Sequence, residues 1–431
     1  MHRVLTALCL FALALTAPTV PTAAAEPDWP TFRGADRTDV SKDTNLLKEW
    51  PADGPPLVWK TTGLGVGFSS VAVMGDKVYT MGDVDKSCLL LSIDRKTGDK
   101  LWELKVGPNG GGGGYIGPRC TPSTDGELVF ALGFAGDLVC ATAKDGKEVW
   151  RKNFKTDFKG RSGGWSYAES PLIDGDHLIV TPGGPDAAVV ALEKKTGKPV
   201  WTGTIPGNDS AGYASLVPAE LGGVKQYVTL MANGLVSFAA KDGKMLWRYG
   251  TKDDRFGHNT ANIPTPIVKG EYVFSAAGYG RGAALLKVTK SGNEFAVEEV
   301  YWKKEMTNKH GGVVLVGDKL FGDRDDSGNP WCADFKTGNV LWSRRGGKGP
   351  KGGAGEGGGS ASLTYADGKL YIRYSNGWVA LADATADKYT EISSFKVPNG
   401  RNNTWAHPVV VGGKLYIREL DVLYCHDVSA K

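Results

Sequence analysis

Acidic residues at two places in the chain have the type and spacing that metal binding or acid–base chemistry requires. Glu169 stands directly before Ser170-Pro171, at the predicted start of an inner strand. A carboxylate buried there could ligate Ca²⁺ or act as a general base. It could equally form an ion pair with Arg119 of the neighbouring repeat. Glu169 is therefore the one candidate for catalysis and also a candidate metal ligand.

The second acidic cluster is Asp323-Arg324-Asp325-Asp326-Ser327-Gly328, which fits the first half of an EF-hand-like calcium loop. Asp334 stands at the twelfth position, where such loops usually carry Glu. The cluster also falls one residue short of a sialidase-type Asp box. A polar hairpin turn explains the pattern as well, so Asp323 and Asp325 are candidate metal ligands with that alternative open.

Aromatic, basic, amide and imidazole side chains gather in the loops between repeats, where binding sites on rigid scaffolds are common. The candidate cofactor-binding or ligand-binding residues are Arg119, Trp165, Tyr213, His258, Asn259, His310, Trp405 and His407. The alternative is that these side chains cap inner strands and bind ordered water.

A recurrent phrase predicts the elements that position these residues. It consists of Thr or Asp, then Gly, and four residues after the Gly a Trp, at intervals of roughly 50 residues, as expected for four-stranded propeller blades. The phrases end at Trp102, Trp150, Trp201, Trp247 and Trp342. Their Gly permits the tight turn between the third and outer strands.

The repeat predicts an all-β fold, an eight-bladed β-propeller of four-stranded antiparallel blades. The predicted blades are 68–107, 119–154, 166–205, 212–250, 262–302, 309–346, 356–398 and 405–428. The last lacks an outer strand, which we expect Leu57–Thr61 to supply, with Trp59 as its signature residue. In the fifth blade the signature Trp is delayed to Trp302, and the seventh has none.

The ends of the chain and its charge limit localisation and partners. Residues 1–25 have the charged start, apolar stretch and small-residue cleavage site of a signal peptide, which predicts export to the periplasm. We expect residues 26–56 to lead into a single propeller at 57–431, not membrane-spanning and monomeric. The net charge of +4 and the absence of a basic run argue against nucleic acid as a partner.

The cysteines that follow the signal peptide are expected to be small packing residues, and none forms a zinc-type or haem-type pattern. Cys140, Cys332 and Cys425 fit the same third-strand position of different blades. A disulfide between Cys120 and Cys140 is the alternative.

The segment Ser92-Ile93-Asp94-Arg95-Lys96-Thr97-Gly98-Asp99-Lys100-Leu101-Trp102 resembles the repeat of the PQQ-like β-propellers. The starts of the inner strands, Thr121-Pro122, Ser170-Pro171 and Thr265-Pro266, fit the same family. This superfamily includes quinoprotein alcohol dehydrogenases and BamB-type assembly factors. The resemblance covers about eight repeats and implies the fold; it does not by itself imply a cofactor.

Departures from the enzymes favour a binding role. The chain has no adjacent Cys-Cys pair and is shorter than most quinoproteins; it also lacks the lipoprotein signal of BamB. We expect an exported binding or scaffold protein of the cell envelope, with a protein or small-molecule ligand at the channel face. The alternative is a quinoprotein oxidoreductase with PQQ and Ca²⁺, in which Trp165 or Trp405, Arg119 and Glu169 would hold the cofactor. An exported sugar- or polymer-active enzyme is a third hypothesis.

Overall fold

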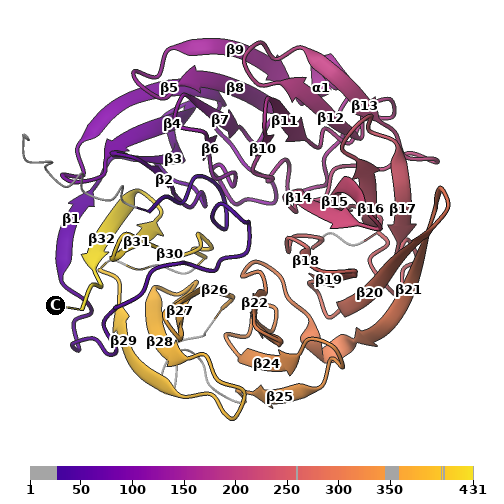
Figure 1. Ribbon diagram of the computed structural model, residues 1–431. Helices are drawn as coiled ribbons and strands as arrows, with labels where there is room; N and C mark the ends of the chain where they lie inside the picture. The colour runs from indigo at the N-terminus through magenta and orange to yellow at the C-terminus, as the bar shows by residue number, and fades with distance from the viewer. Residues whose placement is uncertain (1–26, 259–260, 345–358, 399, 401–402, 431) are drawn as a thin grey trace, which may run out of the picture.

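The computed structural model describes residues 27–258, 261–344, 359–398, 400 and 403–430. These residues form eight four-stranded antiparallel sheets arranged as blades around a central axis (Figure 1). Within the described part, the helices are one α-helical turn, α1 (Phe154–Phe158), and one 3₁₀ turn, η1 (Lys304–Met306). The predicted eight-bladed propeller is confirmed.

The strands of blades 1 to 4 follow one another in chain order from the axis outward. Blade 1 contains β2 (Ala72–Met74), β3 (Lys77–Val84), β4 (Ser87–Asp94) and β5 (Lys100–Pro108). Blade 2 contains β6 (Ser123–Thr124), β7 (Leu128–Leu132), β8 (Asp137–Thr142) and β9 (Glu148–Asn153). Blade 3 contains β10 (Leu172–Asp174), β11 (His177–Val180), β12 (Val189–Glu193) and β13 (Pro199–Gly203). Blade 4 contains β14 (Val217–Leu221), β15 (Val224–Met231), β16 (Gly234–Ala239) and β17 (Met245–Tyr249).

Blades 5 to 7 repeat this order, and blade 8 takes its outer strand from the other end of the chain. Blade 5 contains β18 (Ile267–Lys269), β19 (Tyr272–Ala277), β20 (Gly282–Ser291) and β21 (Glu294–Lys303). Blade 6 contains β22 (Val314–Val316), β23 (Lys319–Asp323), β24 (Pro330–Asp334) and β25 (Val340–Ser343). Blade 7 contains β26 (Ala361–Ala366), β27 (Lys369–Tyr374), β28 (Trp378–Asp383) and β29 (Glu391–Lys396). Blade 8 contains β30 (Val409–Val411), β31 (Lys414–Glu419), β32 (Val422–Asp427) and β1 (Leu57–Thr61).

The ring closes as the sequence predicts, because β1 pairs antiparallel with β32. Trp59 stands opposite Cys425 in this pair, just as Trp150 stands opposite Cys140 in blade 2. Closure removes the free sheet edge that β32 would otherwise present. Blade 8 is thereby completed by backbone hydrogen bonds between distant parts of the chain.

Neighbouring blades dock through the signature tryptophans. Each donor indole N–H reaches a backbone carbonyl of the next blade: Trp59 to Arg95 (3.1 Å), Trp102 to Ala143 (3.3 Å), Trp150 to Lys194 (2.8 Å), Trp201 to Ala240 (3.1 Å) and Trp342 to Thr385 (2.9 Å). In four of these five contacts, those of Trp59, Trp102, Trp150 and Trp201, the turn glycine of that next blade lies against the ring. A β-carbon at Gly197, whose φ is 69°, would lie 2.8 Å from the Trp150 ring. The repeated Gly of one blade and the repeated Trp of the preceding blade therefore pack against each other in one interblade contact.

Blade 5 corrects one prediction. Tyr301 stands opposite Leu285, in the position of the signature residue, and the expectation that Trp302 takes it is wrong. A register shift between Leu285 and Leu286 sets this alignment, and the Tyr301 hydroxyl donates to the Phe335 carbonyl at 2.9 Å. Trp302 instead packs on Phe256, with ring centroids 5.0 Å apart.

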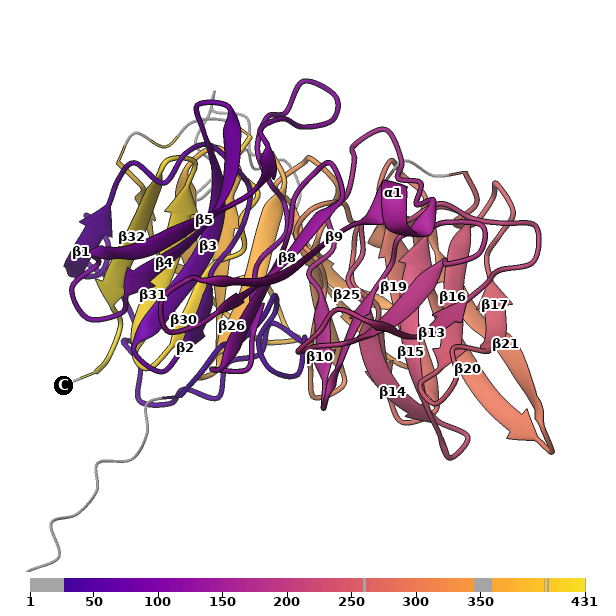
Figure 2. The ribbon, with the colours of Figure 1, turned by 90° about the horizontal axis from the view of Figure 1, so that it is seen from above.

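The N-terminal segment crosses the centre of the ring before it reaches β1. It leaves blade 1 at Trp29, which bridges Val73, and reaches blade 7 at Val40, which bridges Tyr365. Figure 2 shows these first residues along the lower side of the ring, whereas α1 lies on the upper side. This central segment, residues 29–41, closes one end of the channel.

The five cysteines of the described residues are free and buried, so the packing prediction is confirmed for them and the Cys120–Cys140 disulfide is not formed. Burial raises the pKa of the Cys120 and Cys140 thiols to about 12, which leaves them protonated and unreactive. No helix in the described ranges has the length and apolar character needed to cross a membrane.

We predict that Trp150→Ala lowers the free energy of unfolding by about 3–5 kcal/mol, because it empties a buried interblade contact. Denaturant unfolding of the purified protein measures this. Val149→Ala is the control, because Val149 is 43% exposed beside it and should change stability by less than about 0.5 kcal/mol. Equal effects of the two substitutions would contradict the docking role.

Candidate functional site

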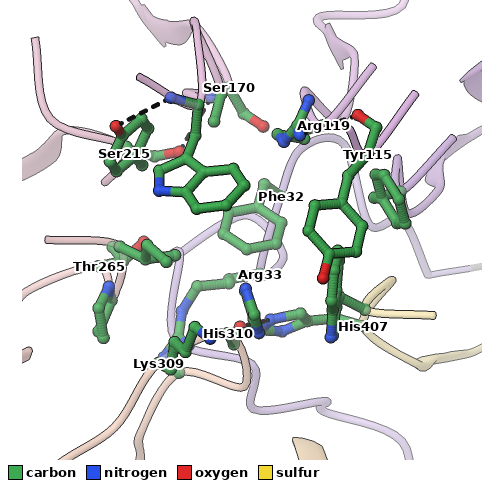
Figure 3. A pocket seen from close by; sticks show the side chains of 18 of the residues that line it. Phe32, Arg33, Tyr115, Arg119, Ser170, Ser215, Thr265, Lys309, His310 and His407 are labelled. Carbon is green, nitrogen blue, oxygen red and sulfur yellow. Dashed lines mark hydrogen bonds between the residues drawn. The ribbon is translucent and has the colours of Figure 1, made fainter. Parts of the chain in front are cut away.

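A cavity occupies the centre of the ring above the central segment (Figure 3). It encloses about 1090 Å³ of space between protein atoms, its open mouth included. Most of its wall comes from the loops that lead from one blade's outer strand to the next blade's inner strand, and Phe32 and Arg33 of the central segment form its floor.

The structure brings most of the predicted binding residues to this cavity. Those that line it are Arg119, Trp165, Tyr213, His310, Trp405 and His407. His258 is exposed outside the lining, with its backbone N–H bonded to Asn233 Oδ1 at 2.9 Å. Asn259 lies outside the described residues, as do residues 345–358 of another predicted loop and the predicted signal peptide.

Aromatic rings form one wall of the cavity. Tyr115 lies between Trp165 and Trp405, with ring centroids 5.8 Å and 4.9 Å away. Trp405 also stacks on His310 at 4.3 Å and contacts Phe68 at 4.8 Å. The tilts between Tyr115 and its neighbours are 46° and 64°, so the wall presents several flat faces at different angles.

The floor is held by a buried charged network. Arg33 Nη1 lies 2.8 Å from Asp39 Oδ2, and Arg33 Nη2 donates to the Val313 carbonyl at 2.7 Å. His407 Nδ1 lies 2.9 Å from the same Asp39 oxygen, while its Nε2 lies 3.1 Å from the His310 carbonyl. Both of these partners are acceptors, so each can take a hydrogen bond from an imidazole N–H.

Hydroxyl groups at the starts of the inner strands link the blades around the channel. Thr121 Oγ1 accepts from Ser70 N–H (3.1 Å), Ser170 Oγ from Thr121 N–H (2.9 Å) and Ser215 Oγ from Ser170 N–H (2.9 Å). The next hydroxyl in the series, Thr265 Oγ1, is buried and has no hydrogen-bond partner, although Thr265 lines the cavity.

The lining carries positive charge and, among the described residues, no carboxylate. Lys309 Nζ is paired with Asp326 at 2.6 Å, outside the lining. Arg119 donates to the carbonyls of Gly112, Tyr115 and Gly117, but no carboxylate of the described residues lies within ion-pair distance of it. Burial lowers the pKa of Arg119, although the guanidinium remains charged at neutral pH.

His310 is neutral and not placed to activate a nucleophile. Burial and, next, the charge of Lys309 lower its pKa to about 3. Its Nδ1 lies 3.0 Å from Ser360 Oγ, whose own proton goes to Asp326 Oδ1 at 2.6 Å. His310 therefore donates to the serine, which is the reverse of the polarity in a catalytic triad.

Glu169 is fully buried beside the cavity and does not line it. Its Oε1 accepts from Thr181 N–H at 2.6 Å, Oε2 has no partner, and burial raises its pKa to about 7. The alternative pairing with Arg119 is wrong, since the cation whose charge acts on Glu169 is Arg37 of the central segment. The carboxylate is thus a group of the blade interior and has no place in the cavity wall.

The predicted calcium loop is a hairpin whose carboxylates have separate partners. Asp323 Oδ2 accepts from Ala361 N–H (2.9 Å), Asp325 accepts from Gly280 N–H (2.8 Å), and Asp334 pairs with Lys319 (2.8 Å). Burial raises the pKa of Asp323 to about 8. Across the described ranges, no three His, Cys, Asp or Glu side chains gather as a metal site.

Sequence reasoning missed Phe32, Arg33 and Tyr279 as lining residues. The first two belong to a segment that the repeat pattern does not describe. Tyr279 lies in the turn between β19 and β20, and such turns face the cavity mouth together with the interblade loops. A search of those turns for large aromatic residues could have found it.

We predict that the free energy of unfolding of the wild-type protein decreases between pH 5 and pH 8. The decrease should be about 2–3 kcal/mol larger than that of the Glu169→Gln variant over the same range. The folded-state pKa of Glu169, about 7, exceeds the ordinary 4.5, so its stabilising contribution is full below pH 4.5 and is lost as pH rises through 7. Denaturant unfolding at several pH values tests this, and parallel profiles would contradict it. Asp334→Asn, which removes a more exposed carboxylate with a lowered pKa, serves as control.

Comparison with known proteins places the chain in a family. A family model described as "Outer membrane protein assembly factor BamB" matches residues 86–344. BamB of Burkholderia pseudomallei is 26% identical over 308 residues, which cover 66% of this chain and 68% of that protein. BamB of Yersinia pestis is 25% identical, with 57% and 60% covered. The match therefore spans about two thirds or less of these relatives.

Solved structures share the fold at low identity. BamB from Moraxella catarrhalis has a TM-score of 0.60 at 16% identity, covering 86% of this chain and 99% of that one. Quinohemoprotein alcohol dehydrogenase from Comamonas testosteroni has a TM-score of 0.65 at 13% identity, covering 95% and 82%. The chain belongs to the PQQ-like β-propeller family described as outer membrane protein assembly factor BamB.

Proposed function

We propose that this protein is exported to the periplasm and acts as a binding or scaffold protein in the cell envelope, with protein partners in outer membrane protein assembly. The observation that carries this proposal is the match of the BamB family model over residues 86–344. The likeness in fold over 99% of the Moraxella catarrhalis BamB chain is consistent with it. The expected signal peptide, residues 1–25, supports export.

The face of the propeller around the cavity mouth is the surface that we assign to the partner. Large apolar or aromatic side chains are exposed there: Val66 is 39% exposed, Ile116 54% and Tyr279 50%. Val66 and Ile116 lie on adjoining loops, because Phe68 N–H donates to the Pro118 carbonyl at 2.8 Å. Exposed apolar groups next to a polar cavity rim are typical of interaction sites.

We predict that Ile116→Asp reduces cross-linking of the protein to an outer membrane assembly component at least about tenfold, since a charge would be buried on docking. In-cell cross-linking and mass spectrometry of the envelope fraction measure this. Val200→Asp is the matched control, because Val200 is 45% exposed on the outer strand β13. If only Val200→Asp reduced the cross-linking, the partner would bind at the blade edges. If the protein were found in the cytoplasm, the proposal would be overturned.

The fold likeness to quinohemoprotein alcohol dehydrogenase raises a PQQ- and Ca²⁺-dependent oxidoreductase as the alternative. Ca²⁺ takes six to eight oxygen ligands, with carboxylates prominent among them. The described cavity lining contains no carboxylate, and Glu169 is buried outside it. The residues present do not fit the calcium ion that this alternative needs.

Calorimetric titration with PQQ separates the two functions. We predict that adding Ca²⁺ leaves the affinity for PQQ unchanged, because the lining lacks the carboxylates to hold the ion. Glu169→Gln should likewise leave the titration unchanged. Binding that requires Ca²⁺ and is lost in this variant would favour the oxidoreductase.

A further inference from the structure

We propose that the central cavity is a binding site for a small organic anion, namely a six-membered ring that carries a carboxylate. This proposal does not rest on the proposed scaffold function. The proposal follows from three properties of the lining: its charge, its unused hydrogen-bond donors and its flat aromatic faces.

The charge of the lining selects for an anion. Arg33 and Lys309 each have a carboxylate partner outside the lining, Asp39 and Asp326. Arg119 donates hydrogen bonds only to neutral carbonyls among the described residues and lies over the Phe68 ring, while the charge of the Asp83 carboxylate acts on it from beyond ion-pair distance. A guanidinium matches the planar geometry of a carboxylate, and the pairing is stronger in a cavity shielded from water. Arg119 is therefore the anchor for the anionic group.

The hydroxyl groups supply donors that the protein leaves unused. Thr265 Oγ1 is buried, has no partner and belongs to the lining; the whole residue is 4% exposed. Burying a hydroxyl without a hydrogen bond is unfavourable, so its retention is explained by a partner that binds in the cavity. Ser215 Oγ already accepts from Ser170 N–H and so presents its proton as a donor. Donors without matching carboxylates favour an acceptor-rich ligand.

The aromatic wall selects for a ring. Tyr115, Trp165 and Trp405 present flat faces at angles to one another, and Ile263 and Pro264 add apolar surface. The face of a six-membered ring, aromatic or sugar, buries apolar area against such walls. Figure 3 shows Tyr115 and Arg119 on one side of the cavity and Thr265 on another, so a ring between them can contact both kinds of donor.

Calorimetric titration with benzoate and with glucuronate tests the inference. The two probes show whether the cavity prefers an aromatic ring or a sugar ring. Benzamide and glucose are the matched neutral controls. We expect at least one acid to bind at millimolar concentration or tighter and its neutral partner at least about tenfold more weakly, the ratio for loss of one charged hydrogen bond. Added salt should weaken the binding.

Two substitutions locate the site. Arg119→Gln should weaken binding of the acid at least about tenfold and reduce the preference over the neutral partner. Thr265→Val should weaken it about threefold to tenfold without loss of stability, because the deleted hydroxyl has no protein partner. Ser275→Ala is the control, since Ser275 Oγ is also buried and unpartnered in blade 5 but does not line the cavity.

The outcomes decide the inference independently of the proposed function. The inference would be overturned if neither acid bound at 10 mM, which is about the weakest affinity of interest. It would also be overturned if an acid and its neutral partner bound equally, or if Thr265→Val and Ser275→Ala had equal effects on binding. None of these results bears on the cross-linking of the partner, which Ile116→Asp tests. Normal thermal unfolding of Thr265→Val shows that a loss of binding does not come from misfolding.

Discussion

The buried guanidinium groups of Arg33 and Arg37 connect the central segment to the blades around it. Arg37 Nη1 donates to the carbonyls of Ser170 and Leu216, each at 3.0 Å, and Arg33 reaches Val313 in blade 6. Burial lowers the pKa of Arg37 to about 10, opposed by the charge of Glu169, so it stays charged at neutral pH. Eight short inner strands leave space at the axis, and these residues fill its lower end. The channel thereby becomes a cavity with a floor.

The sequence predicts the blades well because the contact that orders them is local and repeated. The turn glycine and the signature aromatic recur in most blades, and each pair docks one blade on the next, so the periodicity carries the tertiary information. Blade 5 shows the limit: a register shift places Tyr301 where spacing alone suggests Trp302. The central segment has no periodicity, and the left-handed backbone of Arg33 (φ 66°), Arg37 (φ 55°) and Asp39 (φ 56°) has no signal in the repeat.

Part of the candidate site could likewise be predicted from the sequence, and part could not. The interblade loops converge because the propeller geometry requires it, which is why Trp165, Tyr213 and Trp405 meet as expected. The directions in which the acidic side chains point cannot be predicted from their positions in the sequence alone. Glu169 turns to the Thr181 amide, and Asp323 turns to the Ala361 amide, because a buried backbone donor needs an acceptor. Which face a side chain takes beside an inner strand depends on such local demands, and the residue pattern does not record them.

The loop of residues 109–119 belongs both to the cavity and to the exposed face. Arg119 at its end holds the carbonyls of Gly112, Tyr115 and Gly117, while Ile116 between them is exposed to solvent. An anion that engages Arg119 competes with these carbonyls, and a partner that docks on Ile116 fixes them in place. Because both events act on one set of hydrogen bonds, any effect of the ligand on partner affinity is matched by an equal effect of the partner on ligand affinity. Under these two proposals, the cavity and the exposed face therefore share the hydrogen bonds of Arg119.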